Sequence, residues 1–168
     1  PLAYIAFSKA SMLSKQGACR AFDASGDGYV RSEGSAIMVL KPLKNAVRDG
    51  NRIYAVVAGS GLNSDGRTNG LTVPSVEAQA TLLRDVYARA GIDPADIDYI
   101  EAHGTGTAVG DPIEARALGE ALGKRRPAGS PLRIGSVKSN LGHLETASGM
   151  AGLVKVLLCL EHRSVPPS

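Results

Sequence analysis

The sequence predicts an α/β fold with a mainly parallel sheet. From residue 34 onward, short apolar or β-branched stretches alternate with stretches of helical periodicity, and short connections join them. This alternation is typical of a layer in which parallel strands are covered by helices. Hydrophobic residues make up 43% of the 168 residues and charged residues 21%, which fits a globular domain.

The N-terminal part predicts two strands and one short helix. The first thirty residues are polar and rich in turn signals. After them, residues 34–40 (GSAIMVL) are predicted to form a short strand and residues 42–48 a brief helix. The β-branched stretch 52–62 (RIYAVVAGSGL) is predicted to be a second strand that ends in a glycine turn. Asp-Gly and Asn-Gly pairs then predict a loop over residues 63–72.

A long helix is predicted to begin at Pro74. Val76, Ala80 and Leu83 share one face at a spacing of 3.6 residues per turn, and Gly91 is the expected C-terminal cap.

The next strand–helix unit carries a strong helix-start signal. A strand is expected over residues 97–102. Asp111 is predicted to cap the following helix, with Pro112 in the first helical position and Glu114 reaching back to the cap amide. Gly123 marks its expected end.

The last elements complete the predicted layer. A strand is expected over residues 132–136 and a helix over about residues 146–162, apolar on nearly all faces and therefore deeply buried. Loops 63–72, 103–110 and 137–143 each follow a predicted strand. Because parallel strands end at the same edge of a sheet, we expect these loops to converge on one site.

Composition excludes several classes of function. A net charge of +3 and an aromatic content of 4% do not indicate a nucleic-acid partner. The apolar runs are too short to span a membrane, and no signal peptide stands out, so a cytoplasmic location is expected.

Neither the cysteines nor the acidic loop predicts a metal or disulfide site. Cys19 and Cys159 form no pattern of metal ligands or disulfides, and both are expected to be structural. The stretch 23–34 (DASGDGYVRSEG) is similar to a calcium loop, but Gly34 stands where the bidentate glutamate would be required. We therefore interpret it as a structural turn and expect no metal.

The stretch 101–107 (EAHGTGT) is the first candidate for chemistry. Val109 stands where a dinucleotide fingerprint would need its third glycine. His103 lies at the end of a predicted strand, and the hydroxyls of Thr105 and Thr107 suit hydrogen bonds to a ligand arm that carries amides. The alternative is that these small residues only allow a tight strand-to-helix connection.

The stretch 136–145 (SVKSNLGHLE) is the second candidate. Lys138 follows a predicted strand, and His143 lies at the start of the last helix. A lysine near an imidazole disfavours the doubly protonated ring, which leaves a neutral donor that can polarise an oxygen. The alternative is that His143 only hydrogen-bonds the backbone at a helix start.

These motifs, in this order, resemble the β-ketoacyl synthase (ketosynthase) domain of modular, type I polyketide synthases. GDPIEA lies between the two histidine motifs, and FSKASMLS, CRAFDASGDGYVRSEG, VVAGSGLNSDG and LEHRSVPP are similar to the same family, so the resemblance covers the whole chain. It implies a thiolase-like α/β fold with αβαβα layers, incomplete in this chain. Residues 1–50 would be the end of the N-terminal half and residues 51–168 most of the C-terminal half.

The resemblance implies decarboxylative Claisen condensation of an acyl-enzyme with a malonyl-type extender, carried on the phosphopantetheine arm of an acyl carrier protein. By the family pattern, His103 and His143 donate to one thioester oxygen and stabilise the developing enolate. Lys138 supports them electrostatically, and Thr105 and Thr107 hold the pantetheine arm. No cofactor is expected to bind directly.

The resemblance also implies roles for other segments and partners. Asp65, Thr72 and Pro74 lie in the loop that shapes or gates the acyl entrance. The family nucleophile would precede CRAFD in a cysteine-rich elbow, so this chain is expected to hold no nucleophile and to be inactive alone. The expected partners are the acyl carrier protein, a second copy in a homodimer, and other synthase domains such as the acyltransferase.

Two other classes of protein stand as alternatives. A non-catalytic ketosynthase-like module would dimerise and bind partners, but such proteins typically lose active-site residues, whereas His103, His143 and Lys138 are present. A degradative thiolase would need a second cysteine as its base, which fits the two histidine motifs less well.

Overall fold

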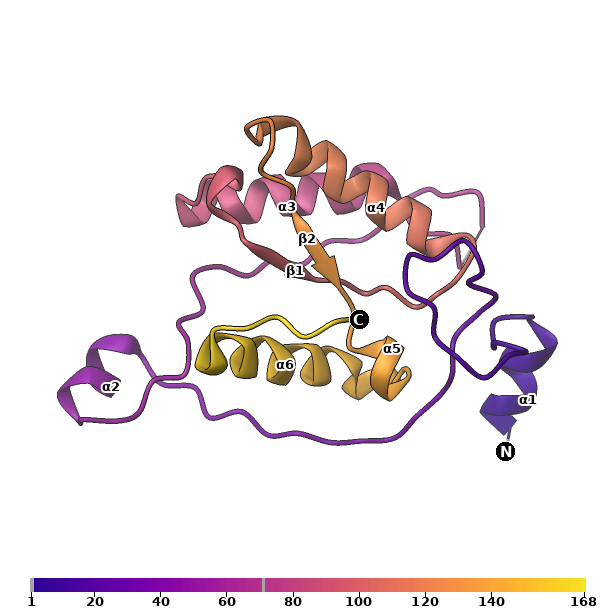
Figure 1. Cartoon of the computed structure of the whole chain (residues 1–168), viewed down its shortest axis with the longest axis horizontal. Helices are drawn as coiled ribbons and strands as arrows, with labels where there is room; N and C mark the ends of the chain where they lie inside the picture. The colour runs from indigo at the N-terminus through magenta and orange to yellow at the C-terminus, as the bar shows by residue number, and fades with distance from the viewer. Residues whose placement is uncertain (1, 71) are drawn as a thin grey trace.

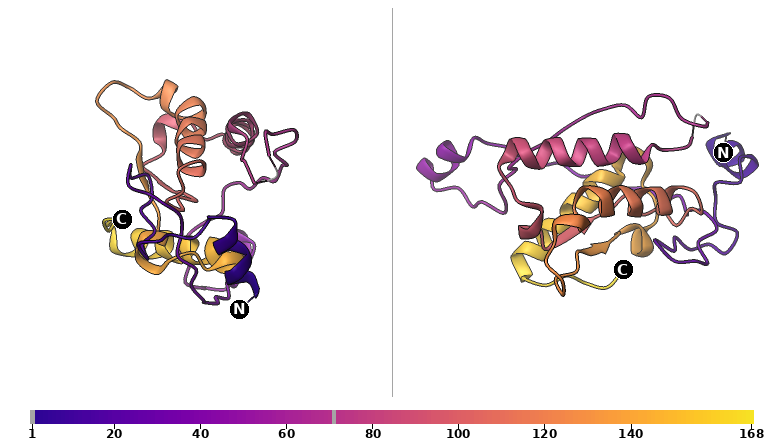
Figure 2. Two further views of the ribbon diagram at one scale, coloured as in Figure 1. Left: turned by 90° about the vertical axis from the view of Figure 1, so that its right-hand side faces the viewer. Right: turned by 90° about the horizontal axis from the view of Figure 1, so that it is seen from above.

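In the computed structural model, which describes residues 2–70 and 72–168, a small parallel sheet lies between two layers of helix (Figure 1). Strand β1 (Tyr99–Glu101) pairs in parallel with β2 (Arg133–Gly135), and Ile100 lies opposite Ile134. Helices α3 (Val76–Ala90) and α4 (Gly110–Ala121) lie on one side of this sheet and α6 (Ser148–His162) on the other (Figures 1 and 2). The predicted α/β layering is therefore confirmed.

Shorter elements surround this layer. Helix α1 (Leu2–Lys9) and helix α2 (Leu43–Arg48) lie at opposite ends of the molecule (Figure 1). Helix α5 (Lys138–Leu141) follows β2, and 3-10 helices span Pro94–Asp96, Gly123–Arg125 and Glu145–Ala147. Helix α1 was not predicted, although its sequence LAYIAFSK holds no helix-breaking residue.

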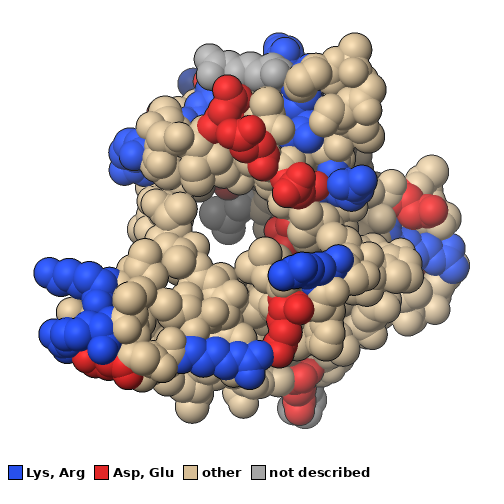
Figure 3. Space-filling model, turned by 60° about the vertical axis from the view of Figure 1, so that its left-hand side comes forward, with Lys and Arg blue, Asp and Glu red and all other residues tan. Residues whose placement is uncertain are grey.

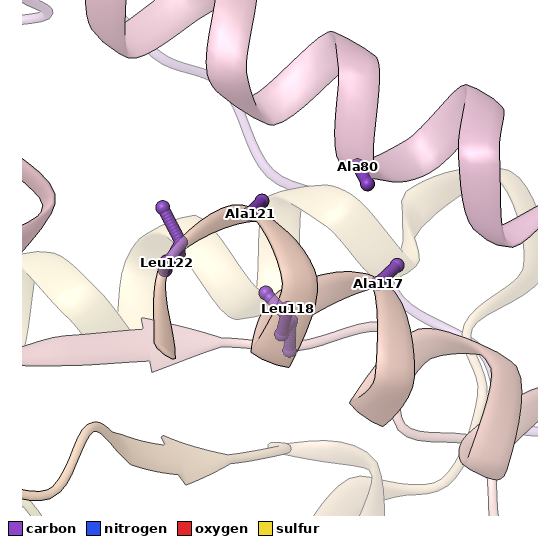
Figure 4. Close-up of a cluster of buried hydrophobic side chains, with 5 residues drawn as sticks. All are labelled: Ala80, Ala117, Leu118, Ala121 and Leu122. Carbon is purple, nitrogen blue, oxygen red and sulfur yellow. The ribbon is translucent and has the colours of Figure 1, made fainter. Parts of the chain in front are cut away.

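The core lies where α3 packs on α4 (Figure 4). Ala80 of α3 and Ala117 of α4 are completely buried, and their small side chains allow the two helices to approach closely. Leu118, Ala121 and Leu122 complete this cluster, which sits over β1 and β2. Truncating the fully buried Leu122 to alanine would cost about 2–5 kcal/mol of folding free energy.

The predicted long helix is confirmed as α3, although it begins at Val76 and not at Pro74. Val76, Leu83 and the buried Ala80, from the predicted apolar face, pack in or against the core cluster. The Ser75 hydroxyl accepts the N–H of Ala78 at 3.2 Å, and Gly91 ends the helix in the left-handed conformation at φ 66°.

The predicted start of α4 is wrong. The helix begins at Gly110, whose N–H donates to the Thr107 hydroxyl at 3.2 Å, so Asp111 lies inside the first turn. The Asp111 carboxylate turns back and accepts N–H groups of the preceding loop, among them Gly106 at 3.1 Å. Glu114 likewise accepts the N–H of His103 and not that of the cap residue. Both carboxylates find more donors in that loop than at the helix end.

Two predicted strands are not formed. Residues 34–40 and 52–62 contain no strand, whereas the predicted helix between them is confirmed as α2. A strand needs a neighbour that satisfies its N–H and C=O groups, and within the described residues neither segment has one. Ile37, Val39 and Leu62 are accordingly 91–95% exposed.

Helix α6 is less buried than predicted. Gly152 and Lys155 are buried, but Leu153, Leu158 and Leu160 are 40–55% exposed because only one face of the helix packs on the sheet. On the face drawn in Figure 3, basic and acidic side chains lie next to one another in several places, with broad surfaces of other residues between them. Exposed apolar side chains such as these leucines are typical of contact with further polypeptide.

Candidate active site

His103 follows β1 closely and is held through its backbone. Its N–H donates to Glu114 Oε1 at 2.7 Å, and the next N–H, of Gly104, donates to Glu114 Oε2 at 2.8 Å. The Ser136 hydroxyl, just after β2, donates to the Gly104 carbonyl at 2.9 Å. The turn that carries the imidazole is therefore fixed to both α4 and the loop after β2.

His143 is fixed on the opposite side of the site by the segment around Tyr29. Its N–H donates to the Val30 carbonyl at 2.7 Å, and its carbonyl accepts the N–H of Ser32 at 3.0 Å. The ring nitrogen Nδ1 accepts the N–H of Glu145 at 2.9 Å. A neutral imidazole that accepts at Nδ1 carries its proton at Nε2, so Nε2 is the donor that His143 offers.

The two imidazoles lie together. Their ring centroids are 5.4 Å apart and their planes stand at 88°, while the Tyr29 ring lies 4.9 Å from that of His143. Burial lowers the pKa of both histidines, and the charge of Lys138 lowers both further. His103 is exposed to solvent, which screens part of this effect, whereas His143 is partly buried. Both rings are thus neutral hydrogen-bond donors near pH 7.

Lys138 is the residue that was predicted to support the histidines electrostatically. It is the first residue of α5 and is 5% exposed. Burial lowers the pKa of its ammonium group, while the carboxylates of Glu114 and Glu101 oppose that shift. The charged lysine disfavours an imidazolium at His103 or His143.

Thr105 and Thr107 lie in the same turn as His103. Their hydroxyl oxygens are 3.0 Å apart, and Thr105 is 6% exposed while Thr107 is partly exposed. The buried Asp111 carboxylate shapes this turn: it accepts the N–H of Phe22 at 2.7 Å and the N–H groups of Thr105, Gly106 and Thr107 at 3.1–3.4 Å.

The loop predicted as a gate lies at the start of α3. The Asp65 carboxylate accepts the N–H of Ser75 at 3.1 Å, and Thr72 and Pro74 lie just before that helix. Leu71 lies outside the described residues. In the part of the chain that is described, no hydrogen bond joins this loop to the turns that carry His103 and His143. Of the three loops expected to converge, the two that follow β1 and β2 come together. The role of residues 63–72 as a gate stays a prediction.

A buried polar group behind the site was not predicted. Glu101 Oε1 accepts the N–H of Val137, next to Lys138, at 2.6 Å, and Glu101 Oε2 pairs with Lys155 Nζ at 2.9 Å. The Tyr99 hydroxyl also donates to Glu101, at 2.6 Å. The available signal was Lys155, the one charged residue in the apolar run from residue 150 to residue 160.

The loop similar to a calcium site is held by the protein itself. Asp27 accepts the Ser14 hydroxyl at 2.6 Å, and Asp23 accepts the N–H of Ser25 at 2.8 Å. No group of three or more potential metal ligands occurs within residues 2–70 and 72–168. Over the same residues, no helix is both long and apolar enough to cross a membrane.

A parallel sheet covered by helices on both sides, with two histidines in the loops after its strands, places the chain among α/β proteins. Residues 54–168 match the family model for the beta-ketoacyl synthase C-terminal domain, and residues 1–46 match that for the N-terminal domain. The chain belongs to the beta-ketoacyl synthase family.

The curated relatives of the chain include polyketide synthases of bacteria and fungi. A phenolphthiocerol/phthiocerol polyketide synthase of Mycobacterium tuberculosis is 54% identical over 168 residues, which cover 100% of this chain and 9% of that protein. A highly reducing polyketide synthase of Penicillium oxalicum is 52% identical over 167 residues, or 99% of this chain and 7% of that protein. The chain thus spans less than a tenth of the length of either relative.

Solved ketosynthases share the fold. The ketosynthase from module 6 of the bacillaene synthase of Bacillus subtilis matches with a TM-score of 0.96 at 47% identity, and an oxazolomycin ketosynthase domain of Streptomyces albus with 0.95 at 46%. The match covers the whole of this chain but only 30% and 29% of theirs. The chain is thus a ketosynthase fragment of the polyketide synthase type with a thiolase-like fold.

Proposed function

We propose that this chain carries the decarboxylation machinery of a ketosynthase that condenses an acyl-enzyme with a malonyl-type extender. The observation that supports this most strongly is the pair of neutral imidazoles, 5.4 Å apart, with His143 offering its Nε2 proton. Two preorganised donors near one point suit an oxygen that gains negative charge.

The chemistry follows from that pair. Loss of CO₂ from the malonyl thioester breaks a carbon–carbon bond and leaves its electron pair in an enolate. His103 and His143 donate to the enolate oxygen, and Lys138 keeps both rings neutral beforehand. The enolate carbon then attacks the acyl thioester of a cysteine, a carbon–carbon bond forms, and the thiolate leaves.

The extender is proposed to arrive on the phosphopantetheine arm of an acyl carrier protein. Thr105 and Thr107 are suited to bind the amides of that arm because they share the turn of His103. Asp65, Thr72 and Pro74 are proposed to border the acyl entrance. A homodimer and an adjacent acyltransferase domain complete the proposed assembly.

Neither cysteine of the chain suits the role of nucleophile. The Val30 N–H donates to Cys19 Sγ at 3.1 Å, and burial raises the pKa of this thiol, whereas a nucleophile needs a lowered one. Cys159 lies in α6. We therefore propose that the 168 residues alone do not catalyse condensation.

The test compares the isolated chain with the complete ketosynthase that contains it. Both are incubated with a labelled acyl thioester and then with malonyl-loaded carrier protein. We expect acyl loading and a β-ketoacyl product only with the complete domain. Loading of the isolated chain would contradict the assignment of its cysteines, and a complete domain without product would favour a non-catalytic binding module.

A further inference from the structure

We propose that the ion pair between Arg31 and Glu145 is a positioning device for His143: it holds Glu145 in the left-handed backbone conformation from which the Glu145 N–H donates to His143 Nδ1. The inference rests on the proposed function of His143 as a donor through Nε2. It assigns to these two residues a role that acts on the reaction only through His143.

The backbone of Glu145 is the first argument. Its φ is 52°, a left-handed value that is unfavourable for a residue with a Cβ. From this conformation its N–H points at Nδ1 of His143, 2.9 Å away. An unfavourable conformation persists only where neighbouring contacts determine it, so the contacts of the Glu145 side chain decide whether the donor stays in place.

The side chain of Glu145 has one strong partner. Arg31 Nε donates to Glu145 Oε1 at 2.6 Å, and the two side chains are 17% and 28% exposed. The Arg31 guanidinium is itself held, because its carbon lies 4.6 Å from the ring centroid of Tyr4 and 5.3 Å from that of Phe7, both on α1. An arginine fixed by two aromatic rings is a rigid anchor for the carboxylate.

The segment that contains Arg31 also holds the backbone of His143. Arg31 and His143 form an isolated parallel bridge, in which the Val30 carbonyl accepts the His143 N–H and the Ser32 N–H donates to the His143 carbonyl. Residues 30–32 therefore fix the backbone of His143, while the Arg31 side chain fixes Glu145. Residues 30–32 thus hold both the backbone that carries the His143 imidazole and the residue whose N–H donates to its ring.

The consequence concerns the tautomer of the ring. With the Glu145 N–H in place, protonation of Nδ1 is excluded in the neutral ring and Nε2 carries the proton. If Glu145 leaves the left-handed conformation, this N–H moves away and the two tautomers compete. Only one of them presents a proton at Nε2 to the enolate oxygen.

The test uses the complete ketosynthase that contains this chain, with CO₂ release from malonyl-loaded carrier protein and ¹⁵N spectra of labelled histidine as readouts. Glu145→Ala and Arg31→Met are expected to slow CO₂ release about tenfold or more, less than the about 10²–10³-fold expected for losing an oxyanion donor outright. The His143 signal should change from one tautomer to a mixture. Glu145→Gly should recover most of the rate and the single tautomer, because glycine adopts the left-handed conformation without a Cβ penalty.

The matched control is Glu120→Ala, which breaks the exposed ion pair with Arg116, 2.8 Å long, on α4. It should change neither readout. Should Glu145→Ala fail to fold, Arg31→Lys and Glu145→Gly provide the comparison, with the lysine variant slower than the wild type and the glycine variant close to it.

Two results would overturn the proposal: a Glu145→Ala protein with the wild-type rate and tautomer, or a glycine variant no better than the alanine variant. Failure of the proposed function looks different. In that case His143→Ala would leave CO₂ release unchanged, while the tautomer spectra would still show whether the ion pair orders the ring.

Discussion

The imidazoles of His103 and His143 lie 5.4 Å apart at nearly right angles, although they come from different loops. One loop follows β1 and the other follows β2, and the parallel pairing of these strands brings their carboxyl ends to one edge. The register that aligns Glu101 with Gly135 thereby places the two loops that carry these imidazoles side by side.

The first prediction concerns pH. Both histidines have a pKa below the ordinary value of 6.5, so they stay neutral in the folded protein where they would be protonated in the unfolded chain. The unfolded chain then binds more protons, and stability falls as the pH falls below about 6.5. The acid limb of kcat/KM for CO₂ release in the complete domain should likewise lie below 6.5.

Lys138 is one cause of the low pKa of both histidines. Lys138→Met removes its positive charge, so the acid limb should move to higher pH. An acid limb above 6.5 in the wild type, or one that Lys138→Met does not shift, would contradict the electrostatic role of the lysine.

The second prediction concerns Asp111. Asp111→Asn replaces a buried carboxylate that accepts backbone N–H groups from residue 22 and from residues 105–107 with a group that has one acceptor oxygen. Unsatisfied buried donors cost about 1–3 kcal/mol each, so urea unfolding should show a loss of at least about 2 kcal/mol. The control is Asp85→Asn on the exposed face of α3, which should stay within about 0.5 kcal/mol of the wild type. Equal stabilities of the two variants would count against the role of Asp111.

The third prediction concerns Gly106. Its φ is 80°, and a Cβ there would lie 2.6 Å from the backbone nitrogen of Arg20. Gly106→Ala should therefore cost more than about 1 kcal/mol and displace the turn that carries Thr105 and Thr107. Gly149→Ala is the matched control, because a Cβ at this position in α6 meets nothing within 4 Å. It should leave the melting temperature equal or higher, and a similar loss in both variants would contradict the packing argument.

The fourth prediction concerns the buried pair behind the site. Lys155→Met leaves the Glu101 carboxylate without its counter-charge and should cost about 3–5 kcal/mol. Adding Glu101→Gln removes that uncompensated charge, so the double variant should lose less than the sum of the two single losses. Additive losses in a double-mutant cycle would show that the two groups do not interact.

Local signals predicted α2, α3 and α6, but neither α1 nor the start of α4. Gly91 ends α3 as predicted because capping depends on neighbouring residues alone. Whether a strand forms depends on a distant partner. Residues 97–102 and 132–136 contain β1 and β2, which pair with each other. Residues 34–40 are equally apolar but have no neighbouring strand among the described residues, and they form no strand.

The sequence singled out two histidines that the structure brings together, but it did not predict their contacts. The histidine motifs identified His103 and His143, yet the proton position on His143 depends on the left-handed backbone of Glu145 and on Arg31, far away in the sequence. Asp111 and Glu114 were predicted as helix caps because their spacing fits a cap. Both carboxylates instead accept N–H groups of the loop before α4, and these donors come within reach only when that loop folds back on the helix.

The most direct test of the central claim is CO₂ release from malonyl-loaded carrier protein by the complete ketosynthase with His103→Ala, His143→Ala or both. If both imidazoles donate to the forming enolate, each single change should slow release by about 10²–10³-fold, and neither ring alone should restore the wild-type rate. Release that survives the double substitution at the wild-type rate would contradict the claim that this pair stabilises the enolate.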